Sequence, residues 1–217
     1  MPEKKRPSAL LKIVIALVVV AVLGYLFIHS LETTRSEPYL VERAHLGKWT
    51  LVLEPAQDPN APLLSVRTSI ELVASLFRQL FHRAMESMNT PPSTSVPIVL
   101  LGEFERGLAG RMTPDDLLTL ALEAGLESAS HEPRCLAHLR ISEPGLTRQA
   151  YFAVMDSPAI VSFREQLAAG AAGSFDAGAL TPIMFVGASD PAFHRWLPIQ
   201  AEEGNCLSPI EVKETLT

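Results

Sequence analysis

The sequence lacks the motifs by which many enzymes are recognised. It has no phosphate-binding glycine loop, no dinucleotide-binding glycine fingerprint, no H-E-x-x-H zinc motif and no G-x-S-x-G nucleophile elbow. Only two of the 217 residues are cysteines, which excludes a disulfide-rich scaffold and a four-cysteine zinc site. We therefore predict no cofactor and no metal, and we favour a non-enzymatic protein.

Charged residues are absent from residues 13–28, and so is the polar face that an amphipathic core helix would have. With its apolar flanks the run extends over residues 9–29, about the ~20 residues that a helix needs to cross ~30 Å of hydrocarbon. We predict a transmembrane signal-anchor helix there, held in the lipid bilayer. No A-x-A-like pattern of small residues follows, so an uncleaved anchor is favoured over a cleaved secretory signal.

The charges around this run predict its orientation. Lys4, Lys5 and Arg6 precede it, and the positive-inside rule places such a basic N-terminus, residues 1–8, in the cytoplasm. The C-terminal part is then extracytoplasmic, which means periplasmic in a Gram-negative bacterium. The chain has net charge −6, and residues 1–30 hold four basic and one acidic residue, so the remainder carries about −9. An acidic surface argues against nucleic acid as a partner.

Hydrophobic periodicity and proline-rich breaks predict one α+β domain with a mixed sheet, in the approximate order β-α-β-α-β-β-α-β. A tether (30–47) leads into this domain (48–200), and a tail (201–217) follows it. Strands are expected at 49–53, 98–101, 135–141, 148–155 and 183–186. Helices are expected at 66–88, from Thr113 to Gly125, from Ser157 to Leu167 and briefly near 191–196, with a loop at 103–111.

Two sets of polar residues are candidates for a metal site or for catalysis. His131, Cys135 and His138 lie within eight residues, but the last two would point to opposite faces of a strand, so a metal site is disfavoured. Glu103 and Glu105 would share one face and could form an acid/base pair. A solvated sheet edge is the favoured interpretation of these two carboxylates.

The two cysteines, Cys135 and Cys206, are candidates for a disulfide if the domain lies in an oxidising compartment. The bond would close a loop of about seventy residues, for which the chain-entropy model gives ~4 kcal/mol of stabilisation. The sequence does not establish that the two residues are close in space.

Two serines and one aromatic cluster are the remaining candidates. Ser157 and Ser189 each lie beside an aspartate where a helix N-cap is expected, and capping is favoured over nucleophilic catalysis. A cluster near the end of the domain could be a partner-binding patch or a lid over the sheet, and the lid is favoured; its members are Phe193, Trp196 and Leu197.

Together these features predict a single-pass membrane protein whose extracytoplasmic domain binds or helps assemble an envelope partner without catalysis. The alternative is a membrane-tethered extracytoplasmic hydrolase that uses Ser157 or Ser189.

Overall fold

The computed structural model describes residues 16–26, 37–84, 86–143, 146–171, 173–200 and 206–215. The chain divides into two units, Met1–Glu37 and Pro38–Thr217. In the first unit, residues 16–26 are helical and their leucine and valine side chains are exposed. Within the described parts of the chain, no helix is both long and apolar enough to span a bilayer. The predicted membrane helix also includes residues 9–15 and 27–29, which lie outside the described residues.

The second unit has the predicted α+β class and contains two β-sheets. The five-stranded sheet is mixed, because β1 and β8 run parallel while its other neighbouring strands are antiparallel. Its strands in spatial order are β1 (Tyr39–Glu42), β8 (Cys206–Lys213), β5 (Glu132–Glu143), β6 (Leu146–Asp156) and β7 (Ile183–Ala188). The antiparallel three-stranded sheet contains β2 (Thr50–Leu53), β3 (Pro62–Thr68) and β4 (Thr94–Leu100).

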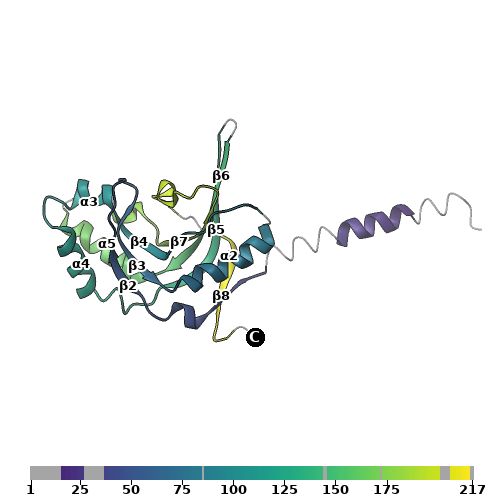
Figure 1. Ribbon diagram of the computed structural model, residues 1–217, viewed down its shortest axis with the longest axis horizontal. Coiled ribbons are helices and arrows are strands. Elements are labelled where there is room, and N and C mark those ends of the chain that lie inside the picture. The colour runs from purple at the N-terminus through teal and green to yellow at the C-terminus, as the bar shows by residue number, and fades with distance from the viewer. Residues whose placement is uncertain are drawn as a thin grey trace, which may run out of the picture. The chain divides into compact units, whose positions relative to one another are not determined.

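Among its described residues, four α-helices and three short 3-10 helices complete this unit. They are α2 (Ile70–Ala84), α3 (Leu101–Gly107), α4 (Pro114–Glu123), α5 (Pro158–Gly170), η1 (Arg43–Leu46), η2 (Ala177–Ala179) and η3 (Phe193–Trp196). Figure 1 shows α2 near β5 and β8, and α3, α4 and α5 gathered at the other end of the domain. The β5–β6 hairpin extends beyond the rest of the sheet.

Both faces of the five-stranded sheet are buried. Side chains alternate between the two faces along each strand, so β6 contributes to a core on each side. In β6, Tyr151, Ala153 and Met155 belong to the larger core, which includes the buried leucines of α2. Phe152 and Val154 point to the other face, into a smaller core with Trp196 and Leu197. The segment around η3 therefore covers the face of the sheet opposite α2.

Two segments that were expected to be irregular form strands. Residues 39–42 of the predicted tether form β1, and residues 206–213 of the predicted tail form β8, which lies between β1 and β5. Along β8 the buried Ser208 and Ile210 alternate with exposed residues, and Pro209 interrupts the apolar pattern. Because this periodicity is weak, the sequence predicted a tail there. At the other end, β1 belongs to the domain, which begins at Pro38 instead of residue 48.

The chain before and after β4 also differs from the prediction. Residues 62–68 form β3, so the helix expected at 66–88 begins at Ile70. The loop expected at 103–111 starts as helix α3, whose first amides donate to the β2–β3 loop: Leu101 N to Ala61 O at 2.9 Å and Gly102 N to Pro59 O at 2.8 Å. Gly102 permits this approach, since a Cβ there would lie 3.0 Å from Pro59 O.

Candidate functional site

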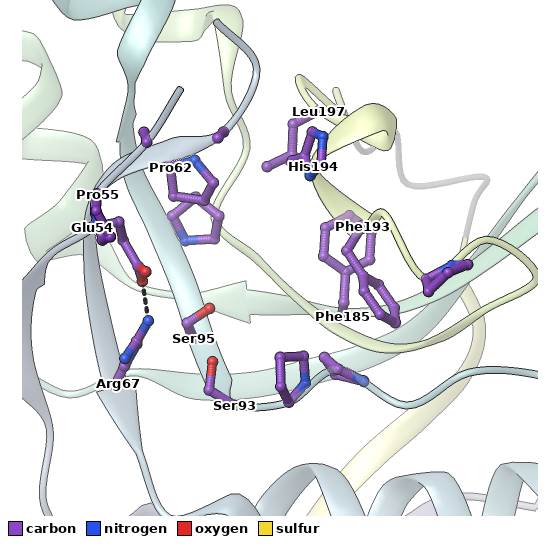
Figure 2. Close-up of a pocket in the computed structure, with 16 residues that line it drawn as sticks. Glu54, Pro55, Pro62, Arg67, Ser93, Ser95, Phe185, Phe193, His194 and Leu197 are labelled. Carbon is purple, nitrogen blue, oxygen red and sulfur yellow. Dashed lines mark hydrogen bonds and ion pairs between the residues drawn. The ribbon is translucent and has the colours of Figure 1, made fainter. Parts of the chain in front are cut away.

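A cleft of about 340 Å³ lies between the outer face of the three-stranded sheet and η3 (Figure 2). The β2–β3 loop, the start of β4 and one residue of β7 complete its walls. Prolines dominate the lining: Pro55, Pro62, Pro91, Pro92, Pro97 and Pro191. We refer to this feature as the proline-lined cleft.

The floor of the cleft follows from the register of the sheet. Arg67 of β3 lies opposite Ser95 of β4, and Ser65 lies opposite Pro97. Their neighbours along the chain, such as Val66 and Val96, are fully buried in the larger core. Because successive side chains alternate between faces, the polar set must lie on the outer face. One side of this small sheet thus builds the core and the other builds the cleft.

Glu54 and Arg67 form an ion pair on this floor, and Ser65 Oγ donates to Glu54 Oε1 at 2.9 Å. The pair is partly shielded, with 34% of the Arg67 side chain and 22% of the Glu54 side chain exposed. Arg67 Nε has no hydrogen-bond partner among the described residues. The two charges of this pair therefore balance on the cleft floor.

Two aromatic rings form the opposite wall. Phe185 of β7 and Phe193 of η3 have centroids 5.4 Å apart, and Leu197 follows on the same wall. His194 reaches across to the β2–β3 loop, where its Nε2 lies 3.7 Å from Asp58 Oδ2. Figure 2 places Ser93 and Ser95 between Arg67 on one side and Phe185 on the other.

The predicted partner patch is not an exposed patch. Trp196 and Leu197 are only 6% and 4% exposed and belong to the smaller core, as the lid alternative expected. Pro191 and Pro198 flank this segment, which turns back over the sheet, and the Arg148 guanidinium lies 6.0 Å from the centre of the Trp196 ring. Phe193 alone of the three is partly open, and it lines the cleft.

Cys135 of β5 and Cys206 of β8 form a disulfide, with their Cα atoms 5.8 Å apart. The bond links neighbouring strands at the point where β8 starts. It leaves Cys135 no thiolate to bind a metal beside His131 and His138. No three metal-binding side chains in the described ranges are grouped so that they could hold an ion.

Ser157 meets a histidine inside the domain. Its hydroxyl lies 2.6 Å from His131 Nδ1, and His131 Nε2 lies 2.7 Å from the carbonyl oxygen of Leu126. A carbonyl only accepts, so Nε2 carries the proton and Nδ1 accepts from Ser157. Burial lowers the pKa of His131, although the hydrogen bond to Leu126 opposes this, and Ser157 is itself 2% exposed.

The serine capping expectation is wrong for Ser157. This residue is the N-cap of α5, but its side chain makes no cap hydrogen bond because it donates to His131 instead. Ser189 is exposed and joins β6 to β7: its hydroxyl accepts from Gln149 N at 3.0 Å and donates to Gln149 O at 3.3 Å. Only Ser157 therefore lies next to a base.

Glu103 and Glu105 lie in the same helix, and their side chains point in different directions. Glu103 in α3 pairs with the buried Arg164, whose Nη2 lies 2.8 Å from Glu103 Oε1, while Glu105 is exposed. The expectation of a solvated sheet edge is wrong for Glu103, because the preceding strand ends at Leu100 and the helix turns this carboxylate inward. The two carboxylates do not form an acid/base pair.

A second polar cluster lies past the end of α2. Tyr151 donates to Glu86 Oε2 at 3.4 Å, and its ring stacks on His138 with centroids 4.4 Å apart. Burial, with the nearby Glu86 carboxylate, raises the pKa of Tyr151 to about 12. Burial also lowers the pKa of His138, partly offset by Gln149 and Glu86. Both groups are therefore neutral at pH 7 and serve packing in this arrangement.

The residues of the cleft floor were not among the sequence candidates. Glu54, Arg67, Ser93 and Ser95 have no motif spacing, and they meet only because β2, β3 and β4 pair. The available signal was indirect: proline-dense segments at 55–62 and 91–97 flank this small sheet. The prolines therefore indicate where the cleft lies, but not which polar residues form its floor.

Comparison with profiles of known protein families finds none that matches the chain. Curated proteins and solved structures likewise give no match. The chemistry of the sequence and the geometry of the cleft are therefore the guides to function.

Proposed function

We propose that the protein is a single-pass membrane protein whose extracytoplasmic domain binds an envelope partner through the proline-lined cleft. The anchor is the apolar stretch 9–29, with Lys4, Lys5 and Arg6 on its cytoplasmic side. In the described helix, four consecutive residues that project to all sides, Leu17, Val18, Val19 and Val20, are 65%, 56%, 50% and 67% exposed. A helix that is apolar all round is stable in hydrocarbon and poorly soluble in water.

The disulfide supports the same location for the domain. Structural disulfides persist in oxidising compartments and are rare where thiols are kept reduced. The only two cysteines of the chain form this bond, and it lies in the unit that the charge asymmetry would place outside the cytoplasm. Two independent features, one at the N-terminus and one in the sheet, thus favour the same topology.

The cleft is the observation that carries the binding proposal. It is concave, its walls are mostly apolar, and a few polar groups converge on its floor, which is the usual composition of a binding site. Part of its lining lies on β3, β4, β7 and η3, and hydrogen bonds from α3 fix one end of the β2–β3 loop. A site on rigid elements can bind without ordering a long loop first.

Site-specific photo-crosslinking in intact cells tests this proposal. A benzoylphenylalanine at Ser93 should form one defined adduct, and the same group at Ser142 on the β5–β6 hairpin should not. Alkaline carbonate extraction should leave the protein in the membrane pellet, and external protease should reach the domain only after the envelope is opened. Recovery in the soluble fraction would refute the anchor, and equal adducts from both positions would refute the cleft as the binding site.

A hydrolase is the second candidate, and the Ser157–His131 hydrogen bond favours Ser157 over Ser189 for this role. The 2.6 Å contact has the geometry in which a histidine can take a serine proton. Both residues are at most 2% exposed, so substrate access would require α5 or the preceding loop to move. A fluorophosphonate probe that labels Ser157 in the wild type and fails with His131→Ala would establish this alternative; no labelling would exclude it.

A further inference from the structure

We infer that the proline-lined cleft takes an extended, uncharged peptide segment that carries one aromatic or large aliphatic side chain. This inference rests on the proposed function and specifies the chemistry of the partner. The apolar side chain would insert between the Phe185–Phe193 wall and Pro62, and the peptide backbone would lie along β4.

Charge balance argues that the bound segment is neutral. Glu54 and Arg67, the charged pair on the floor, neutralise each other. A charged ligand would have to leave water for a partly buried site that offers no net countercharge, which is unfavourable. A peptide amide loses less on transfer and can regain its hydrogen bonds in the cleft.

The apolar wall argues for a single anchoring side chain. Phe185 is 7% exposed and Phe193 is partly exposed, and both line the cleft. Proline rings, as at Pro62, lose little conformational freedom when a ligand packs on them. A cavity of about 340 Å³ is at the small end of the range for ligand sites and suits one large side chain with its adjoining backbone.

The polar groups argue for a peptide in preference to a saccharide. Ser93, just before β4, and Ser95, on β4, are two residues apart in the chain, and both line the cleft. An extended peptide presents its backbone groups on one side with the same two-residue repeat. Neither hydroxyl has a hydrogen-bond partner among the described residues, and Arg67 lies opposite Ser95. Both could therefore bond successive amide groups of one bound segment.

Saturation-transfer NMR on the full chain in lipid nanodiscs tests the inference. The probe is N-acetyl-L-phenylalanine methylamide, with empty nanodiscs as the background. N-acetylglycine methylamide, free N-acetyl-L-phenylalanine and N-acetylglucosamine are measured in parallel. We expect the phenylalanine amide to bind with a dissociation constant on the order of 1 mM, and the glycine amide and the charged acid to bind about tenfold more weakly or not at all.

Two matched variants locate the binding. Ser95→Phe fills the cleft and should abolish the signal, whereas Ser142→Phe adds the same ring on the β5–β6 hairpin and should leave it unchanged. A thermal unfolding transition like that of the wild type shows that each variant is folded. Should Ser95→Phe fail to fold, Ser93→Phe takes its place.

Three results would overturn the inference. The first is no signal from the phenylalanine amide above empty nanodiscs, and the second is a phenylalanine amide signal that persists in the Ser95→Phe variant. The third is an N-acetylglucosamine signal that Ser95→Phe abolishes while the other signals are unchanged. The last would assign the cleft to a saccharide. A crosslinked partner at Ser93 combined with any of these results would retain the binding function and refute only the peptide chemistry.

Discussion

Arg164→Met is expected to be among the most destabilising single substitutions in the domain. The Arg164 side chain is 1% exposed, and all five of its N–H donors are used. Two bond the Glu103 carboxylate, at 3.2 and 2.8 Å. The other three bond backbone carbonyls: those of Ile98 at 2.6 Å, Asp176 at 2.8 Å and Ala177 at 2.9 Å. One guanidinium thus joins α5 to the end of β4, to α3 and to η2.

The magnitude follows from what methionine leaves behind. Its chain fills much of the same space, but among the described residues Glu103 becomes a buried carboxylate bonded only by the backbone amide of Leu100, at 2.9 Å. Removing one partner of a buried ion pair costs about 3–5 kcal/mol. A domain of this size is stable by roughly 5–15 kcal/mol, so the variant could lose most of its stability.

Urea unfolding of the unit Pro38–Thr217 at pH 7, followed by tryptophan fluorescence, measures the effect. The neighbouring exposed Glu165→Met is the control and should change the free energy of unfolding by less than about 0.5 kcal/mol. The double variant Arg164→Met, Glu103→Met should lose about 1–3 kcal/mol less than the sum of the two single variants, because no buried charge remains. A loss below about 1 kcal/mol for Arg164→Met, at an unchanged slope against urea, would refute this reasoning.

Three further predictions concern stability. Replacing Cys135 and Cys206 with alanine should lower the free energy of unfolding by about 4 kcal/mol in urea, since the bond closes a separation of 71 residues; an equal stability would contradict a loop-entropy role. Gly102→Ala should cost about 1–3 kcal/mol in thermal unfolding because its Cβ meets the β2–β3 loop, whereas Gly110→Ala, where a Cβ meets nothing, should cost far less. Burial depresses the pKa of His131 in the folded state, so the unfolded chain binds more protons below its own pKa of about 6.5. Stability should therefore be full above that pH and fall below it, and His131→Phe should flatten the dependence in urea titrations from pH 7.5 to pH 5.

Elements with local signals could be predicted from the sequence. Helix α4 is one of them: Thr113 caps it through Asp116 N at 3.2 Å, Pro114 opens it, and Gly125 follows with φ of +72°. These interactions join residues a few positions apart, so spacing alone reveals them. The same holds for the turn from β6 into α5 at Pro158.

Elements that depend on residues distant in the sequence were not predicted, because local spacing does not reveal such partners. β1 and β8 are parallel strands from opposite ends of the domain, with Tyr39 paired to Ile210, and neither has strong periodicity of its own. The cleft floor is similar, because Glu54 follows β2 and Arg67 lies on β3. Their contact requires β3, and the helix expected at 66–88 overlapped the end of this strand. A one-sided polar face on a short strand is indistinguishable from loop composition until its pairing is known.

Two of the domain's edge strands, β1 and β2, strengthen the case for the cleft as the binding surface. An open edge strand would offer a partner a ready backbone ladder, which is a common mode of peptide binding. On β1, Gln79 occupies that position: Leu40 N donates to Gln79 Oε1 at 2.9 Å, and Gln79 Nε2 donates to Leu40 O at 2.7 Å. On β2, Leu51 N donates to Glu127 Oε1 at 2.8 Å. Side chains thus already occupy backbone groups on these two edge strands, whereas Ser93 and Ser95 in the cleft keep their hydroxyls available, so a partner that seeks hydrogen bonds gains more in the cleft than at β1 or β2.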